Sequence, residues 1–152
     1  ATADSVVGFL KKTQPERWTA LYCCQVTSIV AMRQFVADRA TASLAGWGGH
    51  ARLLVKDEVS REIHIYDPWK QTVEAPPWMR EGVDSHYTLR FVARAADQAY
   101  GEGSCQLQSL TRMLMVALYG ERGVTSLFSA DRPEELAVPV AVQLLVSRLR
   151  RR

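Results

Sequence analysis

Three residues with the chemistry of a base, an acid and a nucleophile occur in this chain in a definite order. His50 follows a glycine-rich stretch, Asp67 lies 17 positions later, and Cys105 follows a second glycine-rich stretch at 101–104. A cysteine nucleophile needs a base that removes its proton, and the base needs a third group that fixes its tautomer. The order therefore predicts nucleophilic catalysis by a Cys-His-Asp triad.

Cys105 lies where a helix is expected to begin. Apolar residues recur after it at steps of three and four positions, and the run ends at Gly120, which predicts a buried helix from about Gln106 to Gly120. The N-terminus of a helix presents unpaired amide donors and partial positive charge, which favour a thiolate. Gly101 and Gly103 would leave room for a substrate backbone.

Three histidines compete for the role of base. His50 begins a predicted strand directly after the glycine-rich stretch, so it has an open approach. His64 alternates with Ile63 and Ile65 and is expected to face outward, whereas His86 lies in a polar segment. His50 is therefore the predicted base.

Asp67 is placed by the expected pairing of two strands. Residues 50–55 and 63–66 are rich in β-branched and aliphatic residues, and the charged stretch 56–61 between them suits a hairpin connection. In such a hairpin, residues whose numbers sum to about 117 would lie opposite each other. This register predicts that Asp67 lies beside His50.

Other segments complete an α+β arrangement. We expect an amphipathic helix over 4–12, a helix in the second half of 18–40 with 22–26 either helical or extended, a loop around Pro68, Pro76 and Pro77, a third strand over 88–93 and a terminal helix from Asp131. The prediction is a single domain over 1–152, in which a small, mainly antiparallel sheet packs against helices and the nucleophile lies at the N-terminus of the central buried helix.

Composition excludes several classes of protein. The hydrophobic fraction is 47%, yet no apolar run is long enough to span a bilayer, so membrane insertion is not expected. The net charge of +3 lies mainly in the arginines at 148–152, a pattern typical of a solvated helix end, and it only weakly supports a nucleic-acid partner. The first residue is not methionine, which predicts a processed N-terminus.

The cysteine count points to a reducing compartment. The chain has three cysteines, an odd number, and two of them, Cys23 and Cys24, are adjacent and are expected to serve in packing. No spacing suggests zinc, and no cofactor is expected. These observations predict an intracellular protein, in the cytoplasm or nucleus, with at least one free thiol.

The ordered set of residues resembles a family of cysteine proteases. Gly49-His50, the stretch Ile63-His64-Ile65-Tyr66-Asp67 and Gly103-Ser104-Cys105 are similar to the papain-like clan that holds the SUMO proteases and the adenoviral protease. Gln98 lies seven residues before Cys105, where that clan has the glutamine of its oxyanion hole. The resemblance covers roughly residues 4 to 120. It implies an oxyanion hole formed by Gln98 and the Cys105 amide, and a polypeptide substrate such as a ubiquitin-like modifier or a viral precursor.

Two departures from the clan keep other functions open. Ala51 stands where the clan usually has tryptophan, so Trp47 or Trp69 would have to cover the imidazole, and Gln106 stands where it usually has glycine. The alternatives to a protease are an inactive scaffold that binds other proteins and an acyltransferase that uses the same triad.

Overall fold

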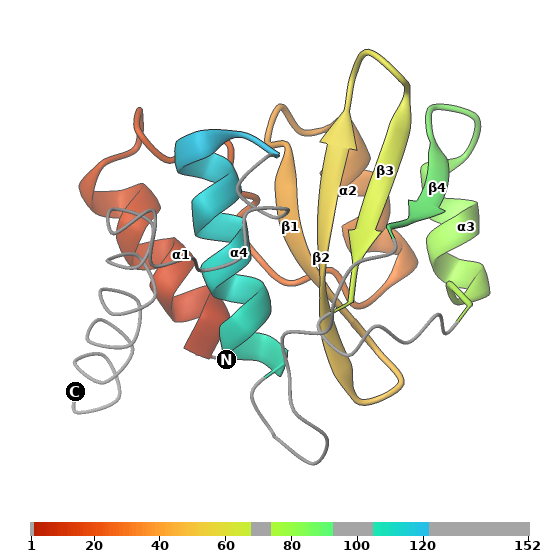
Figure 1. Cartoon of the computed structure of the whole chain (residues 1–152), viewed down its shortest axis with the longest axis horizontal. Helices are drawn as coiled ribbons and strands as arrows, with labels where there is room; N and C mark the ends of the chain where they lie inside the picture. Colours follow the sequence, from red (N-terminus) through yellow and green to blue (C-terminus); the bar gives the residue numbers. More distant parts are fainter. Residues whose placement is uncertain (1, 68–73, 93–104, 122–152) are drawn as a thin grey trace, which may run out of the picture.

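The computed structural model describes residues 2–67, 74–92 and 105–121. Within them the elements follow in the order α1 (Thr2–Thr13), α2 (Ile29–Ala37), β1 (Ala42–Trp47), β2 (His50–Asp57), β3 (Glu62–Tyr66), α3 (Pro77–Val83), β4 (Thr88–Phe91) and α4 (Cys105–Tyr119). The fold is α+β, as predicted (Figure 1). Gln98 and the helix expected from Asp131 lie outside the described residues.

Within the described residues, the sheet has four strands in the order β1-β2-β3-β4. β1 and β2 form an antiparallel hairpin closed by Gly48 and Gly49, both at positive φ, a conformation that favours glycine. β2 and β3 are also antiparallel, which confirms the predicted hairpin, whereas β4 runs parallel to β3. The sheet is therefore mainly antiparallel.

β1 was missed in the sequence, because its small residues Ala42, Ala45 and Gly46 do not resemble a strand. The segment before it is extended for part of its length, since Leu21 and Val26 each form a parallel bridge to β1. The helical alternative for 22–26 is therefore wrong, and Val26 at its end pairs with β1. The helix of this region is confined to α2, whose first turn is capped by Ser28.

α3 was also missed, because the prolines near it were taken to exclude regular structure. Pro77 occupies the first turn of α3, where the absence of an amide hydrogen costs nothing. Gly82 brings α3 close to α2, since a Cβ at this position would lie 2.7 Å from side-chain atoms of Met32. A side chain at position 82 would separate the two helices.

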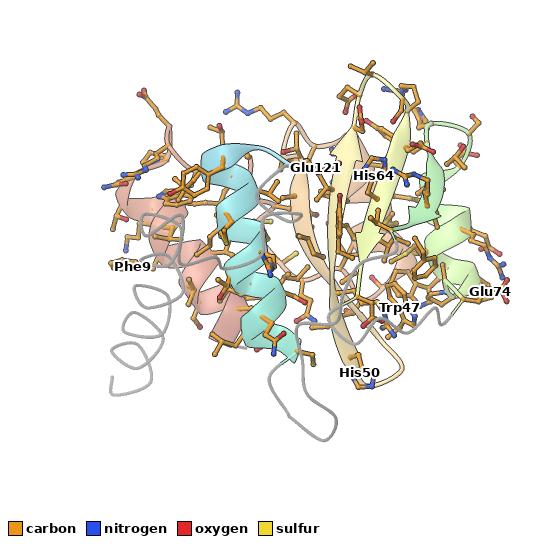
Figure 2. The ribbon with its side chains drawn as sticks, in the orientation of Figure 1. Phe9, Trp47, His50, His64, Glu74 and Glu121 are labelled. Atoms are coloured by element: carbon orange, nitrogen blue, oxygen red, sulfur yellow. The ribbon has the colours of Figure 1, made fainter. Side chains whose placement is uncertain are left out.

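Both faces of the sheet are covered by helices (Figure 1). α1 and α4 pack over one face, which includes Leu53 and Val55 of β2. α2 and α3 cover the other face, which includes Leu54 of β2. Because both faces are buried, the prediction that His64 faces outward is wrong: His64 is 4% exposed. Its Nδ1 lies 2.8 Å from a carboxylate oxygen of Glu121, just beyond α4 (Figure 2).

Among the described helices, none is both long and apolar enough to cross a membrane. The helix predicted up to Gly120 is confirmed as α4, which ends at Tyr119 and is followed by Gly120 at positive φ. This helix runs across β1 and β2, and its buried side chains form one core with those of α1. α4 therefore positions Cys105 through extensive packing along the sheet.

Tyr22 gives the stability of the fold a dependence on alkaline pH. Burial, followed by the neighbouring Cys24 and Cys23 thiols, raises the pKa of Tyr22 to about 12. Because the unfolded phenol ionises first, at its ordinary pKa of about 10, the stabilisation is present below pH 10 and is lost as pH rises toward 12. The free energy of unfolding should therefore fall more steeply between pH 10 and 12 in the wild-type protein than in Tyr22→Phe. Denaturant titrations at several pH values measure this fall. An equal fall in the free energy of unfolding between pH 10 and 12 in the two proteins would contradict the expectation.

Candidate active site

Cys105 is the first residue of α4, and its sulfur lies against the backbone of β2. Its Sγ is 3.5 Å from the backbone nitrogen of Ala51, which donates to it. One turn later, Ser109 Oγ donates to the carbonyl of the same residue over 3.1 Å. These two contacts fix the start of α4 on the residue that directly follows His50. Cys105 is half-buried, so its sulfur is not enclosed in the core.

His50 is the first residue of β2 and lies at the end of the sheet, beside the β1–β2 turn (Figure 2). Its backbone is paired with that of Trp47. Side chains alternate along a strand, so His50 and Arg52 belong to the α2 side of the sheet and Ala51 to the α4 side. Cys105 approaches from the α4 side. The structure thus brings Cys105 to the strand end that carries His50, on the face of the sheet opposite to the one assigned to the His50 side chain.

Asp67 lies just beyond β3, but the predicted register is wrong by two residues. Leu53 pairs with Tyr66, so partners sum to 119, and Asp67 falls opposite Arg52 instead of His50. Arg52 Nε donates to Asp67 Oδ2 over 2.8 Å, and the side chains are 0% and 5% exposed. The turn is shorter than expected because β2 continues to Asp57. A shift of two keeps Asp67 on the face shared by His50.

Arg52 connects the residues of this site and was missed in the sequence. Besides Asp67, it binds the carbonyls of Trp47 at 2.6 Å and of His50 at 3.2 Å through Nη1. Its guanidinium also lies over the Trp47 ring, 4.0 Å from the ring centre. Arg52 thereby holds both sides of the β1–β2 turn. The available signal was a charged residue within the otherwise apolar run 51–55, because a charged side chain that is buried requires a partner.

A glutamine distant in the sequence also reaches the start of α4. Gln106 Nε2 donates to Gln25 Oε1 over 3.3 Å, and the backbone nitrogen of Gln25 donates to Asp4 over 2.9 Å. The Gln25 carboxamide lies over Gly46, where a Cβ would come within 2.9 Å of Nε2. Nothing in the sequence connects Gln25 with Cys105.

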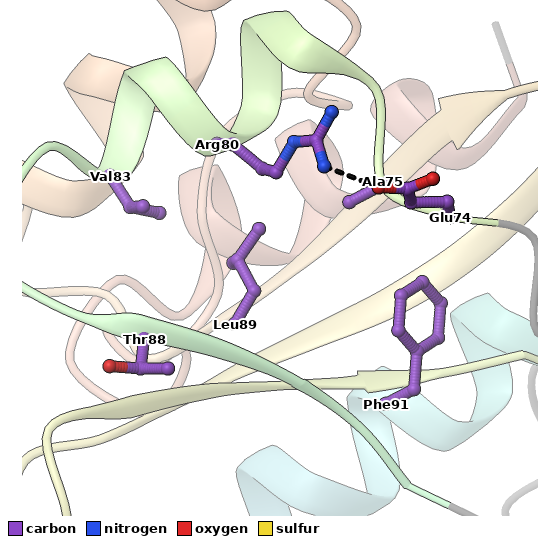
Figure 3. Close-up of a pocket in the computed structure, with 7 residues that line it drawn as sticks. All are labelled: Glu74, Ala75, Arg80, Val83, Thr88, Leu89 and Phe91. Atoms are coloured by element: carbon purple, nitrogen blue, oxygen red, sulfur yellow. Dashed lines mark hydrogen bonds and ion pairs between the residues drawn. The ribbon is translucent and has the colours of Figure 1, made fainter.

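A cavity of about 320 Å³ opens between α3 and β4. Figure 3 shows Leu89 and Phe91 of β4 extending toward α3, with the Glu74–Arg80 ion pair at the side of the cavity. Phe91 also packs edge-on against Trp47, with 6.4 Å between ring centres. The cavity is lined largely by carbon atoms and borders the Trp47–Arg52 pair through this contact. Its lining residues are Glu74, Ala75, Arg80, Val83, Thr88, Leu89 and Phe91.

The other two cysteines are poorer candidates for the nucleophile. Neither begins a helix. Cys23 is exposed, which contradicts its expected packing role, and Cys24 is half-buried. Burial, followed by the adjacent Cys23 thiol, raises the pKa of Cys24, which disfavours its thiolate. In the described part of the chain, no group of three or more histidine, cysteine or acidic side chains could hold a metal ion.

Comparison with known proteins supplies no family for this chain. No protein-family model matches it, and no curated protein matches it. The resemblance to the SUMO and adenoviral proteases therefore stays a prediction. Function has to be inferred from the geometry of the site.

Proposed function

We propose that this protein is a cysteine protease that cleaves peptide or isopeptide bonds, with Cys105 as nucleophile, His50 as base and Asp67 as the acid that orients the base. The observation that carries the proposal is the contact between Cys105 Sγ and the Ala51 amide at 3.5 Å. It joins the N-terminus of a buried helix to the strand end occupied by His50. A ubiquitin-like modifier or a viral precursor is the proposed class of substrate, encountered in a reducing intracellular compartment.

The proposed reaction uses each residue for one step. His50 accepts the thiol proton, and the Cys105 sulfur attacks the carbonyl carbon, so that a C–S bond forms and the carbonyl electron pair moves to oxygen. His50 then returns the proton to the amine as the C–N bond breaks. Water, deprotonated by His50, attacks the thioester and releases the carboxylic acid, and the proton restores the Cys105 thiol.

Asp67 is connected to the backbone of His50 through Arg52. The Asp67 carboxylate binds Arg52 Nε, and Nη1 of the same guanidinium holds the His50 carbonyl. The pair thus fixes the backbone from which the imidazole extends. A carboxylate oxygen accepts more than one hydrogen bond, so the bond to Arg52 leaves Asp67 able to accept from the imidazole as well. The imidazole has to turn around the end of β2 toward the α4 side to reach the sulfur.

Alkylation by iodoacetamide, followed by mass mapping of each cysteine, tests this proposal. Cys105 should react faster than the exposed Cys23 at neutral pH, because the proposed base His50 can accept its proton. His50→Ala should slow alkylation of Cys105 by at least about tenfold. The rate at Cys23 should not change, which makes it an internal control. Equal rates at Cys105 in the wild-type protein and in His50→Ala would exclude the proposed catalytic pair.

An inactive scaffold that binds polypeptides is the second candidate. It is favoured by the bond between Arg52 and Asp67, which engages one oxygen of the proposed acid. Ala51 and Gln106, which depart from the protease clan, point the same way. Such a protein would bind a polypeptide without turnover and would show no His50-dependent alkylation. An acyltransferase would show that alkylation but would need an added acyl acceptor for product formation.

A further inference from the structure

The Gln25 carboxamide lies on the same face of the sheet as the Cys105 sulfur. Gly46 pairs with Ala51 across β1 and β2, so both positions face α4. Gly46 has no side chain, and Gln25 Nε2 occupies the space above it, 2.9 Å from where a Cβ would stand. Cys105 Sγ lies against Ala51, the neighbour of Gly46. The carboxamide and the sulfur therefore approach two adjacent backbone positions from the same side.

The orientation of this carboxamide is fixed at both ends of the residue. Gln106, the residue after Cys105, donates to Gln25 Oε1, while Asp4 holds the Gln25 backbone nitrogen. Because Oε1 is the atom bound to α4, Nε2 is left as the donor. Within residues 2–67, 74–92 and 105–121, no acceptor takes a hydrogen bond from Nε2. A half-buried amide donor thus stands beside the start of α4.

From this geometry we propose that Gln25 is the side-chain donor of the oxyanion hole, the role that the resemblance to the protease clan implies for Gln98. The inference rests on the proposed protease function. When the Cys105 sulfur attacks, negative charge develops on the former carbonyl oxygen, and it is stabilised by donors positioned in advance. Gln25 Nε2 and the amides of the first turn of α4 supply such donors from two sides.

The central test compares Gln25→Ala with the wild-type protein in three assays. Cleavage of a peptide ending in a coumarin amide should lose about 10²- to 10³-fold in kcat with little change in KM, because an oxyanion donor acts mainly in the transition state. Affinity for the aldehyde of acetyl-Gly-Gly should fall in parallel, since its adduct with Cys105 carries the same oxygen. Alkylation by iodoacetamide should be unchanged, because it forms no oxyanion.

Gly46→Ala displaces the carboxamide without removing it. The added methyl group would meet Nε2, the mobile end of a side chain, so the strand should fold while the donor moves. This variant should lose kcat and aldehyde affinity as Gln25→Ala does. Gln14→Ala, at an exposed glutamine, is the matched control and should behave as the wild-type protein.

The outcomes separate failure of this inference from failure of the protease function. A wild-type protein that neither cleaves nor binds the aldehyde would contradict the proposed function. Wild-type turnover together with full activity in Gln25→Ala would contradict only the role of Gln25. A loss of both kcat and aldehyde affinity in Gln98→Ala, with none in Gln25→Ala, would return the role to Gln98. Slower alkylation in Gln25→Ala would show that Gln25 acts on the thiolate and not on the oxyanion.

Discussion

Replacing Cys105 by alanine should abolish peptide and isopeptide cleavage, with a loss of about 10⁴-fold or more in turnover. The C–S bond of the acyl-enzyme cannot form without the sulfur, and no other described cysteine lies at a helix start. The side chain is half-buried and its sulfur accepts from the backbone amide of Ala51 over 3.5 Å, so the variant should keep the fold. Turnover of the coumarin substrate and the thermal midpoint, measured on the same preparation, check both parts of this expectation.

Cys24→Ala is the matched control, since it removes a half-buried thiol that the proposed reaction does not use. It should retain wild-type turnover and should still be alkylated at Cys105. If Cys105→Ala cleaves substrate as fast as Cys24→Ala, the sulfur of Cys105 has no part in the reaction. If Cys105→Ala fails to fold, the comparison is repeated with Cys105→Ser, which keeps the volume of the side chain and replaces the thiol by a much weaker nucleophile.

The elements that the sequence predicted well are those whose apolar residues follow a clear period. α4 was located to within a residue at each end, because its leucines and methionines are spaced for one buried face and Gly120 ends it. β1 and α3 failed for a different reason. β1 is made of small residues without alternation, and its strand character comes from pairing with β2 and with Val26. Tertiary pairing overrode local preference there.

The site was predicted in part for the same reason. The order of a glycine-rich turn, a helix start and a strand start located Cys105 at the start of α4 and His50 at the start of β2, while their catalytic pairing stays a prediction. The predicted partner of Asp67 depended on the length of the turn between β2 and β3, which a charged stretch does not define. An error of two residues in the register placed His50 opposite Asp67, where the structure has Arg52. The position of Gln25 beside α4 could not be predicted from the sequence, because its contact with Gln106 joins residues 81 positions apart.

The pairing of Arg52 with Asp67 leads to the largest expected change in stability. Arg52→Met should lower the free energy of unfolding by about 3–5 kcal/mol, because it leaves a carboxylate that is 5% exposed without its guanidinium. Asp67→Leu should cost a similar amount, since the fully buried Arg52 would lose the same bond. The double variant Arg52→Met/Asp67→Leu should be much more stable than the sum of the two losses implies, since an apolar pair replaces two buried charges. Urea denaturation of the four proteins measures the coupling.

The exposed pair of Arg80 and Glu74 serves as a control for this cycle. Its side chains are 51% and 80% exposed, so its removal should cost at most about 1 kcal/mol. Asp67→Asn completes the experiment, because it keeps the volume and an acceptor oxygen while removing the charge. It should lower turnover by about a hundredfold or more through loss of the correct imidazole orientation. Unchanged turnover in Asp67→Asn, with strong coupling in the cycle, would show that Asp67 serves the fold through Arg52 and takes no part in orienting His50.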